Sequence, residues 1–291
     1  MVNFEKKKTE AFFEKSFPQS KRNYVSENNL ANRDLILIKN IFPRILTKKS
    51  RILDFACGKA EMLSWLSEEK KVKILGVEKS KGQIDAAIKL NGKKIKDKIV
   101  KGSVSYLEKI DDNSFDIILA IGIFQYLSDK DFKKAFENFN RILSPKGILV
   151  ATFQNLFFDL FTFNRFTLDF YLNNLFNDKK SRLPPVPLEL KKYLTKFMPF
   201  GDKPQKDKVR ARDNIYVRLS NPLTIKDDLT RFNFKTNKLY YYNFSGLPPE
   251  MKLKFPLFAG KVEKSLELKN SENWIGAFMA NAFVCELSKM K

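Results

Sequence analysis

Two acidic residues mark the part of the sequence that could bind a ligand. Asp54 lies in the segment Ile52-Leu-Asp-Phe-Ala-Cys-Gly-Lys-Ala-Glu61, where a predicted strand turns tightly into a helix, and Glu78 ends the next predicted strand, 24 residues later. An acidic side chain at the end of a second strand can accept hydrogen bonds from both hydroxyls of a ribose. Backbone N–H groups at the start of the following helix suit a carboxylate. The pattern therefore predicts a site for a nucleoside that carries an amino-acid group.

The absence of histidine limits the chemistry that this site can perform. None of the 291 residues is histidine, which excludes an imidazole base, a Ser-His-Asp triad and a His-ligated metal. Two cysteines, Cys57 and Cys285, are too few for a disulfide framework or a four-thiolate site. We therefore expect no metal, and a general base must be Asp, Glu, Tyr, Lys, Cys or water.

The chain is strongly basic, with a formal net charge of +21 from 54 Lys and Arg against 33 Asp and Glu. Such a charge suits nucleic acid, a membrane surface or an acidic substrate. Because the charges are spread over the whole chain, a solvated surface is the favoured interpretation. The longest uncharged stretch, 273–285, is too short to span a bilayer as a helix. With no signal-peptide pattern at the N-terminus, we expect a cytoplasmic protein.

Strand-like and helical segments alternate through the first half of the chain. The clearest helix is 128–143, where apolar residues form one continuous stripe and Ser128 with Asp131 resembles a capping box. Alternation of this kind predicts a parallel, doubly wound sheet. The predicted strands are 51–55, 72–77, 99–100, 115–120, 147–152, 239–242 and 278–287.

The alternation breaks after Thr152, which suggests an insertion in the sheet domain. Residues 153–176 carry eight phenylalanines, and 179–214 are basic and contain prolines. We expect an N-terminal arm or helix over the cofactor site at 1–32 and a Phe-rich, basic lid over the acceptor at 154–235. The core would then consist of 33–153 and 236–291.

The segment 45–153 resembles the class I S-adenosylmethionine-dependent methyltransferases. Their first loop reads Asp-x-Gly-x-Gly-x-Gly, and here it reads Asp54-Phe-Ala-Cys-Gly-Lys-Ala60, so only the central glycine is kept. Alanine is less free than glycine to adopt a positive φ. The segment 115–127 looks like the family's motif after the fourth strand. The most specific match is 141–150, which looks like the helix-turn-strand that follows.

The resemblance implies a fold, a cofactor and a set of binding residues. The fold would be α/β, a Rossmann-like doubly wound, mostly parallel seven-stranded sheet with an antiparallel last strand and a helical lid insertion. The cofactor would be S-adenosyl-L-methionine, leaving S-adenosyl-L-homocysteine. Glu78 would bind the ribose, and Ser103 and Val104 would flank the adenine. The full implied set is Asp54, Phe55, Ala56, Gly58, Glu78, Lys79, Ser103, Val104, Ile121 and Gly122.

A dinucleotide-dependent dehydrogenase shares Glu78 and the first turn. Its pyrophosphate needs close backbone approach at glycines, and two of the three positions here are alanine. Tyr126 and Lys130 fit the Tyr-x-x-x-Lys pair of short-chain dehydrogenases, but they lie only 68 residues beyond Gly58, too early for that family. We interpret the pair as a coincidence.

Methyl transfer from a sulfonium is an in-line displacement that depends on alignment and exclusion of water. Tyr126 and Asp129 are candidate bases for a hydroxyl acceptor, with Gln125 as a hydrogen-bonding partner, and the sequence does not choose among them. Phe124 and Tyr126 are also placed to wall the methyl group. The predicted acceptor pocket comprises Phe124, Tyr126, Gln154, Asn155, Phe158 and Arg165.

The leading functional hypothesis is methylation of a small-molecule or saccharide-like acceptor, acidic ones included, at oxygen. A loose similarity to methyltransferases of glycan and polysaccharide biosynthesis supports it. The alternatives are N- or S-methylation of a small metabolite, a basic RNA- or DNA-binding methyltransferase, and a cofactor-binding fold without activity. The basic run 203–212 is the warrant for the nucleic-acid alternative.

Overall fold

A computed structural model gives the architecture of the chain. It describes residues 32–69, 72–161, 217–247 and 254–290, together with the single residues 10, 11, 13, 14, 167, 189 and 192. The predicted lid, 154–235, therefore lies largely outside the described residues. No helix among the described residues has the length and apolar character needed to cross a bilayer.

Seven strands form one sheet in the order β3-β2-β1-β4-β5-β7-β6. β7 runs antiparallel to β5 and β6, whereas β1 to β5 pair in parallel, which confirms the predicted fold class. The strands are β1 (Arg51–Phe55), β2 (Lys73–Glu78), β3 (Ile99–Lys101), β4 (Phe115–Ala120), β5 (Leu143–Gln154), β6 (Phe234–Phe244) and β7 (Ala280–Lys289).

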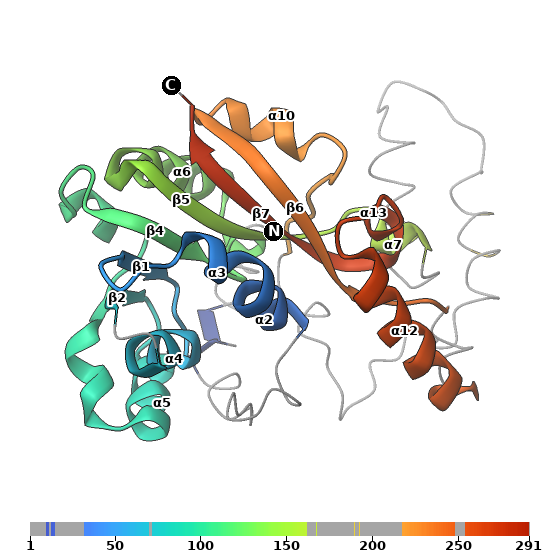
Figure 1. Ribbon diagram of the computed structural model, residues 1–291, viewed down its shortest axis with the longest axis horizontal. Helices are drawn as coiled ribbons and strands as arrows, with labels where there is room; N and C mark the ends of the chain where they lie inside the picture. Colours follow the sequence, from blue (N-terminus) through green and yellow to red (C-terminus); the bar gives the residue numbers. More distant parts are fainter. Residues whose placement is uncertain are drawn as a thin grey trace.

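Helices cover both faces of the sheet, as the buried strands of a parallel sheet require. On β4, Ile118 and Ala120 face one layer and Ile117 and Leu119 face the other. α6 packs on the first face, while α2, α3 and α4 pack on the second (Figure 1). The helices are α2 (Asn32–Ile36), η4 (Leu37–Ile41), α3 (Phe42–Ile45), α4 (Glu61–Glu69), α5 (Lys81–Asn91), η5 (Lys93–Lys98), η6 (Val104–Lys109), η7 (Phe124–Tyr126), α6 (Asp129–Ile142), α7 (Phe158–Phe161), α10 (Ile225–Thr230), α12 (Pro256–Asn270) and α13 (Ile275–Met279).

The strongest local signals of the sequence produce the expected elements. α6 spans Asp129–Ile142, and the Ser128 hydroxyl oxygen accepts from the Asp131 N–H at 3.2 Å, which confirms the predicted helix and its cap. β5 begins earlier than predicted, at Leu143 rather than Gly147, because Leu143 already pairs with Phe115 across an irregularity in the register. Such an irregularity accommodates Pro145, which cannot donate to the ladder.

Ser220, which belongs to the predicted lid, pairs with the chain at the carboxyl end of β5. The Ser220 N–H donates to the Gln154 carbonyl at 2.8 Å, and the Leu156 N–H donates to the Ser220 carbonyl at 3.0 Å. α10 packs against β6. These contacts join 217–233 to the sheet. The domain boundaries as a whole stay a prediction.

An ion pair between a half-exposed arginine and a buried glutamate fastens α3 to the last strand. Glu286 on β7 is 4% exposed, and its carboxylate binds the Arg44 guanidinium, which also donates to the Tyr240 hydroxyl at 3.0 Å. The hydrogen bond to Glu286 raises the pKa of Arg44.

We expect Arg44→Met to destabilise the fold by about 2 kcal/mol, because it leaves the Glu286 carboxylate buried without its cation. The effect is smaller than for a fully buried pair because the Arg44 side chain is 40% exposed. Chemical denaturation measures it. Arg51→Met is the control, since the pair of Arg51 with Asp116 is exposed and should contribute less than about 1 kcal/mol. Equal losses in the two variants would contradict the prediction.

Candidate functional site

Every second residue of the loop between β1 and α4, from Ala56 to Ala60, has a left-handed backbone conformation. Ala56, Gly58 and Ala60 have φ values of 59°, 57° and 56°. The Ala56 and Cys57 N–H groups donate to the Val77 carbonyl at 2.7 and 3.2 Å, which ties the loop to β2. The loop therefore takes a positive φ at two alanines, a conformation that costs an L-residue about 1–2 kcal/mol.

Glu78 lies at the carboxyl end of β2 and reaches back to this loop. One carboxylate oxygen accepts from the Gly58 N–H at 2.9 Å, and the other accepts from the Ser80 N–H at 2.8 Å. Burial raises the pKa of Glu78, and the N–H groups of Ser80 and Gly58 oppose that rise. Each oxygen keeps a second lone pair that can accept from a ligand.

The loop and Glu78 open onto a cavity of about 1240 Å³ at the carboxyl ends of β1, β2, β3 and β4. This volume exceeds the range of about 300–1,000 Å³ typical of single-ligand sites, which leaves room for two molecules. All ten residues of the predicted cofactor set line it: Asp54, Phe55, Ala56, Gly58, Glu78, Lys79, Ser103, Val104, Ile121 and Gly122. Assignment of roles to them stays a prediction.

Comparisons with known proteins agree with this geometry. The family model for a methyltransferase domain matches residues 53–151, from β1 to β5. Residues 53–151 are therefore similar to a methyltransferase domain, and the match covers about a third of the chain. A relative from Rickettsia prowazekii (strain Madrid E), named uncharacterized protein RP028, is 32% identical over 111 residues. That match covers 37% of this chain and 44% of the relative, so the chain spans less than half the length of this curated protein.

Solved structures show the same fold. The PH0226 protein from Pyrococcus horikoshii OT3 superposes with a TM-score of 0.52 at 14% identity, over 94% of this chain and 99% of that one. Phosphoethanolamine N-methyltransferase 2 of Haemonchus contortus, solved with S-adenosyl-L-methionine, has a TM-score of 0.53 at 16% identity, over 97% of this chain and 60% of that one. Identities this low establish the fold alone.

A methyltransferase domain of this fold implies S-adenosyl-L-methionine as the cofactor, and the cavity fits its charge. The cofactor carries a sulfonium and an ammonium group, and three buried carboxylates line the cavity: Asp34, Asp54 and Glu78. One oxygen of Asp34 is buried without a hydrogen-bond partner among the described residues. An unpartnered buried acceptor is costly unless a ligand supplies a donor.

Arg33 and Asp34 are functional candidates that the sequence analysis missed. They lie on α2, before the first strand, and both line the cavity. The Arg33 Nε donates to Asp34 Oδ1 at 2.8 Å, and an Arg33 guanidinium nitrogen lies 3.9 Å from where a Cβ on Gly122 would be. The sequence offered one signal, an adjacent Arg and Asp just before the apolar residues Leu37 and Ile41. Nothing in the sequence, however, placed α2 at the cavity.

Asp54 is the most perturbed carboxyl group of the cavity. It is 4% exposed, and burial raises its pKa to about 7. The Arg33 guanidinium opposes this pKa rise, whereas the Glu78 and Asp34 carboxylates add to it. A cationic ligand beside Asp54 would favour the ionised form.

Three described residues near the N-terminus, Glu10, Phe13 and Glu14, line the same cavity. The Glu14 carboxylate accepts from the Gly82 N–H at 2.7 Å and the Lys81 N–H at 3.1 Å, at the start of α5, and these bonds hold its pKa below the ordinary value. The Phe13 carbonyl accepts from the Gln83 amide at 3.1 Å, and the Phe13 ring lies edge-on to Tyr126 with centroids 5.0 Å apart. These contacts agree with the expected arm over the site, although residues 1–32 as a domain stay a prediction.

The three catalytic candidates lie together along the cavity wall. Gln125, Tyr126 and Asp129 all line it, on and just after the turn η7. The Asp129 carboxylate pairs with the Arg218 guanidinium, and the Asp129 side chain is 92% exposed. Among the described residues, no group of three or more His, Cys, Asp or Glu side chains could hold a metal ion.

Most of the predicted acceptor pocket lies elsewhere. Phe124 is fully buried, stacks on Phe136 and Phe153 at centroid distances of 4.7 and 5.2 Å, and does not line the cavity. Asn155 is also fully buried, because its amide donates to the Ala277 and Ala280 carbonyls at 2.8 Å each. Neither residue lines the cavity, and their assignment to an acceptor pocket stays a prediction. Gln154 and Phe158 do not line the cavity, and Arg165 lies outside the described residues.

We expect Ala56→Gly to stabilise the protein by about 1 kcal/mol, because glycine relieves the cost of the left-handed conformation. Ala60→Gly is the matched control. Ala60 has the same φ, but its methyl group is fully buried, and removing it should offset the relief. Denaturant titration measures both changes, and a destabilised Ala56→Gly variant would contradict the backbone assignment.

We expect cofactor affinity to fall as the pH drops below about 7. Above this pKa Asp54 is ionised and attracts a cation, whereas at pH 6 most Asp54 is protonated, so affinity should be roughly tenfold lower than at pH 8. Calorimetric titration with S-adenosyl-L-homocysteine measures this change. Asp54→Asn retains any pH dependence of the ligand and of Glu78, so equal pH profiles in both proteins would exclude Asp54 as the source.

Proposed function

We propose that the chain transfers a methyl group from S-adenosyl-L-methionine to a polar small molecule, with a hydroxyl of a saccharide-like or acidic compound as the acceptor. The observation that carries the proposal is the Glu78 carboxylate, fixed between the Gly58 and Ser80 N–H groups at the edge of a cavity that also holds Asp54. This arrangement supports a ribose diol at Glu78 and a charged amino-acid group near Asp54.

The proposed binding role of each residue follows from the position of its side chain. Glu78 holds the ribose, and Ser103 and Val104 lie at the adenine position after β3. Asp54 and Arg33 carry opposite charges and both line the cavity. Asp54 would therefore bind the ammonium of the amino-acid group, and Arg33 would bind its carboxylate. When bound, the cofactor supplies an electrophilic methyl group. Binding and alignment then contribute most of the rate, and exclusion of water protects the reaction.

The polar rim of the cavity supports a hydroxyl-rich acceptor. Ser128, Lys130 and Lys134 line it beside Gln125 and Tyr126. Amide and hydroxyl groups can orient a polyol, and the two lysines suit an acidic substituent. In this proposal Tyr126 and Gln125 orient the acceptor, and Asp129, held by Arg218, accepts the proton that a hydroxyl releases.

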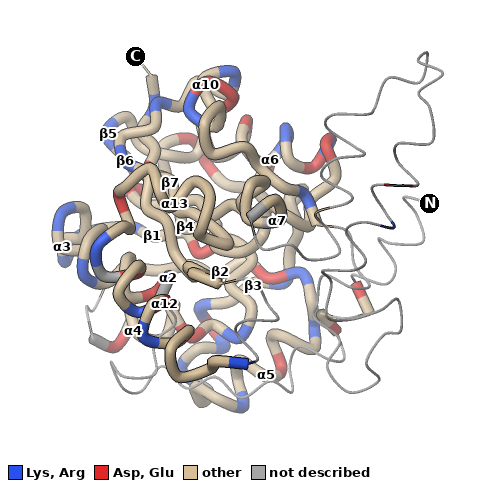
Figure 2. Tube along the Cα trace, turned by 90° about the vertical axis from the view of Figure 1, so that its right-hand side faces the viewer, with Lys and Arg blue, Asp and Glu red and all other residues tan. Residues whose placement is uncertain are grey.

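Amine and thiol acceptors are the alternative that the rim leaves open, since they need no base. One protein of the same fold is named as a phosphoethanolamine N-methyltransferase. A nucleic-acid acceptor has less support. Lys and Arg are scattered among Asp and Glu along the described trace (Figure 2), and the basic run 203–212 lies outside the described residues.

The proposed function can be tested by binding and then by transfer. Calorimetry should show binding of S-adenosyl-L-methionine by the unmodified chain. Incubation with methyl-labelled cofactor and separate pools of uronic acids, neutral sugars, amines, thiols and RNA then identifies the acceptor class. Labelled sugar supports the proposal, labelled amine or RNA replaces its acceptor, and the absence of cofactor binding refutes it.

We expect Glu78→Gln to weaken cofactor binding at least tenfold, because it replaces a charged acceptor of ribose hydroxyls by an amide. Glu68→Gln, an exposed carboxylate on α4, makes the same chemical change away from the cavity and should bind as the unmodified chain does. Thermal melting of both variants checks that the loop remains folded. Unchanged affinity in a folded Glu78→Gln variant would remove Glu78 from the site.

A further inference from the structure

α12 separates its charges between its two faces. Both of its acidic side chains face the protein: the Glu267 carboxylate accepts from the Asn243 and Phe244 N–H groups at 3.0 and 3.1 Å, and Glu263 contacts the Ser245 hydroxyl at 3.5 Å. Val262 lies on the same inner face and packs over Gly246. The acids of the helix are therefore used within the fold.

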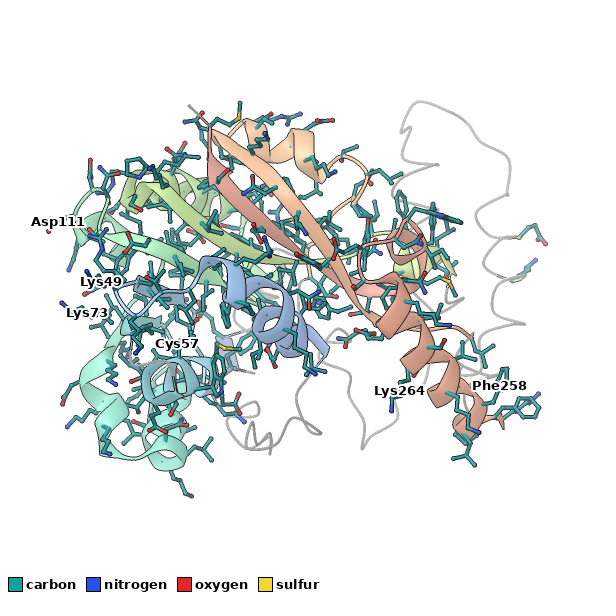
Figure 3. The ribbon with its side chains drawn as sticks, in the orientation of Figure 1. Lys49, Cys57, Lys73, Asp111, Phe258 and Lys264 are labelled. Carbon is teal, nitrogen blue, oxygen red and sulfur yellow. The ribbon has the colours of Figure 1, made fainter. Side chains whose placement is uncertain are left out.

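The outer face of α12 consequently carries only positive charge. Lys261, Lys264 and Lys269 are exposed, and none of the three makes an ion pair among the described residues. With 3.6 residues per turn, all three lie on one side of the helix. Figure 3 shows Lys264 projecting outward from α12, at the end of the molecule away from β1 and β2.

Large apolar side chains share this basic face. Leu257 is 85% exposed and Phe258 is 60% exposed, at the first turn of the helix, and Phe258 also projects outward in Figure 3. Leu257, Lys261 and Lys264 follow the i, i+4, i+7 spacing of a single stripe. Leu and Phe in such positions cost free energy in water unless something covers them.

The combination of lysine and exposed hydrocarbon fits one kind of partner. Lysine ammonium groups are attracted to anionic lipid, at about 1 kcal/mol per residue near the surface. Their long aliphatic stems let the charge remain among the lipid headgroups while neighbouring apolar side chains insert more deeply. Helices that present Lys together with Phe and Leu on their exposed side can lie in the plane of a bilayer surface. A purely electrostatic partner would leave Leu257 and Phe258 without a role.

We propose that the outer face of α12, formed by Leu257, Phe258, Lys261, Lys264 and Lys269, docks on the surface of an anionic phospholipid bilayer. The lysines supply the attraction, and Leu257 and Phe258 insert at the acyl boundary. This surface lies outside the cavity, because none of its residues lines it. The proposal is therefore independent of the methyl acceptor.

Co-sedimentation of the full chain with vesicles tests the proposal. The unmodified chain should bind vesicles of phosphatidylcholine mixed with phosphatidylglycerol, bind far less to phosphatidylcholine alone, and release with added salt. K261Q combined with K264Q should weaken binding roughly thirtyfold. L257S combined with F258S should weaken it at least tenfold while the salt dependence remains.

Two matched variants distinguish docking by α12 from the general basicity of the chain. K94Q combined with K96Q makes the same charge change at exposed positions of η5, and Leu223→Ser removes an apolar side chain that is 61% exposed. Both should bind vesicles as the unmodified chain does. Equal losses in the η5 and α12 charge variants, or no binding of anionic vesicles by the unmodified chain, would overturn the proposal. Melting temperatures confirm that each variant is folded.

Discussion

The hydrogen bonds of the Glu78 carboxylate are the constraint on which the site depends. A carboxylate that is 8% exposed needs donors, and the chain supplies them from two loops, at Gly58 and at Ser80. This one side chain therefore couples the β1–α4 loop to the start of α5. The left-handed backbone of the loop aims the Gly58 N–H at Glu78, and so the strained residues and the buried charge stabilise each other.

The electrostatics of the cavity follow from its position in the fold. Parallel strands bring their carboxyl ends to one edge, which places Asp54 and Glu78 together, and α2 adds Asp34 with its partner Arg33. Burial raises the pKa of Asp54, and the nearby Glu78 and Asp34 carboxylates add to that rise against the opposing Arg33 cation. The cavity is thus suited to a ligand that carries positive charge.

Much of this arrangement could be predicted from the sequence, because it depends on local order along the chain. The strand ends at Asp54 and Glu78 and the cap at Ser128 are short-range features. Arg33 and Asp34 could not be placed in advance, since only the packing of α2 against distant β6 brings them to the cavity. The alanines at 56 and 60 also show that a preference for glycine at positive φ is a matter of energy rather than a prohibition.

Phe124 shows that a sequence pattern does not distinguish a core residue from a cavity-lining residue within one turn. Phe124 and Tyr126 stand two residues apart in one turn, and composition alone makes both candidates for a pocket wall. The structure instead sends Phe124 into a stack with Phe136 and Phe153 and leaves Tyr126 at the cavity. A tightly packed aromatic stack has few alternative arrangements, so it anchors the turn η7, which also carries Gln125 and Tyr126. These two side chains therefore line the cavity from a turn that is attached to the hydrophobic core.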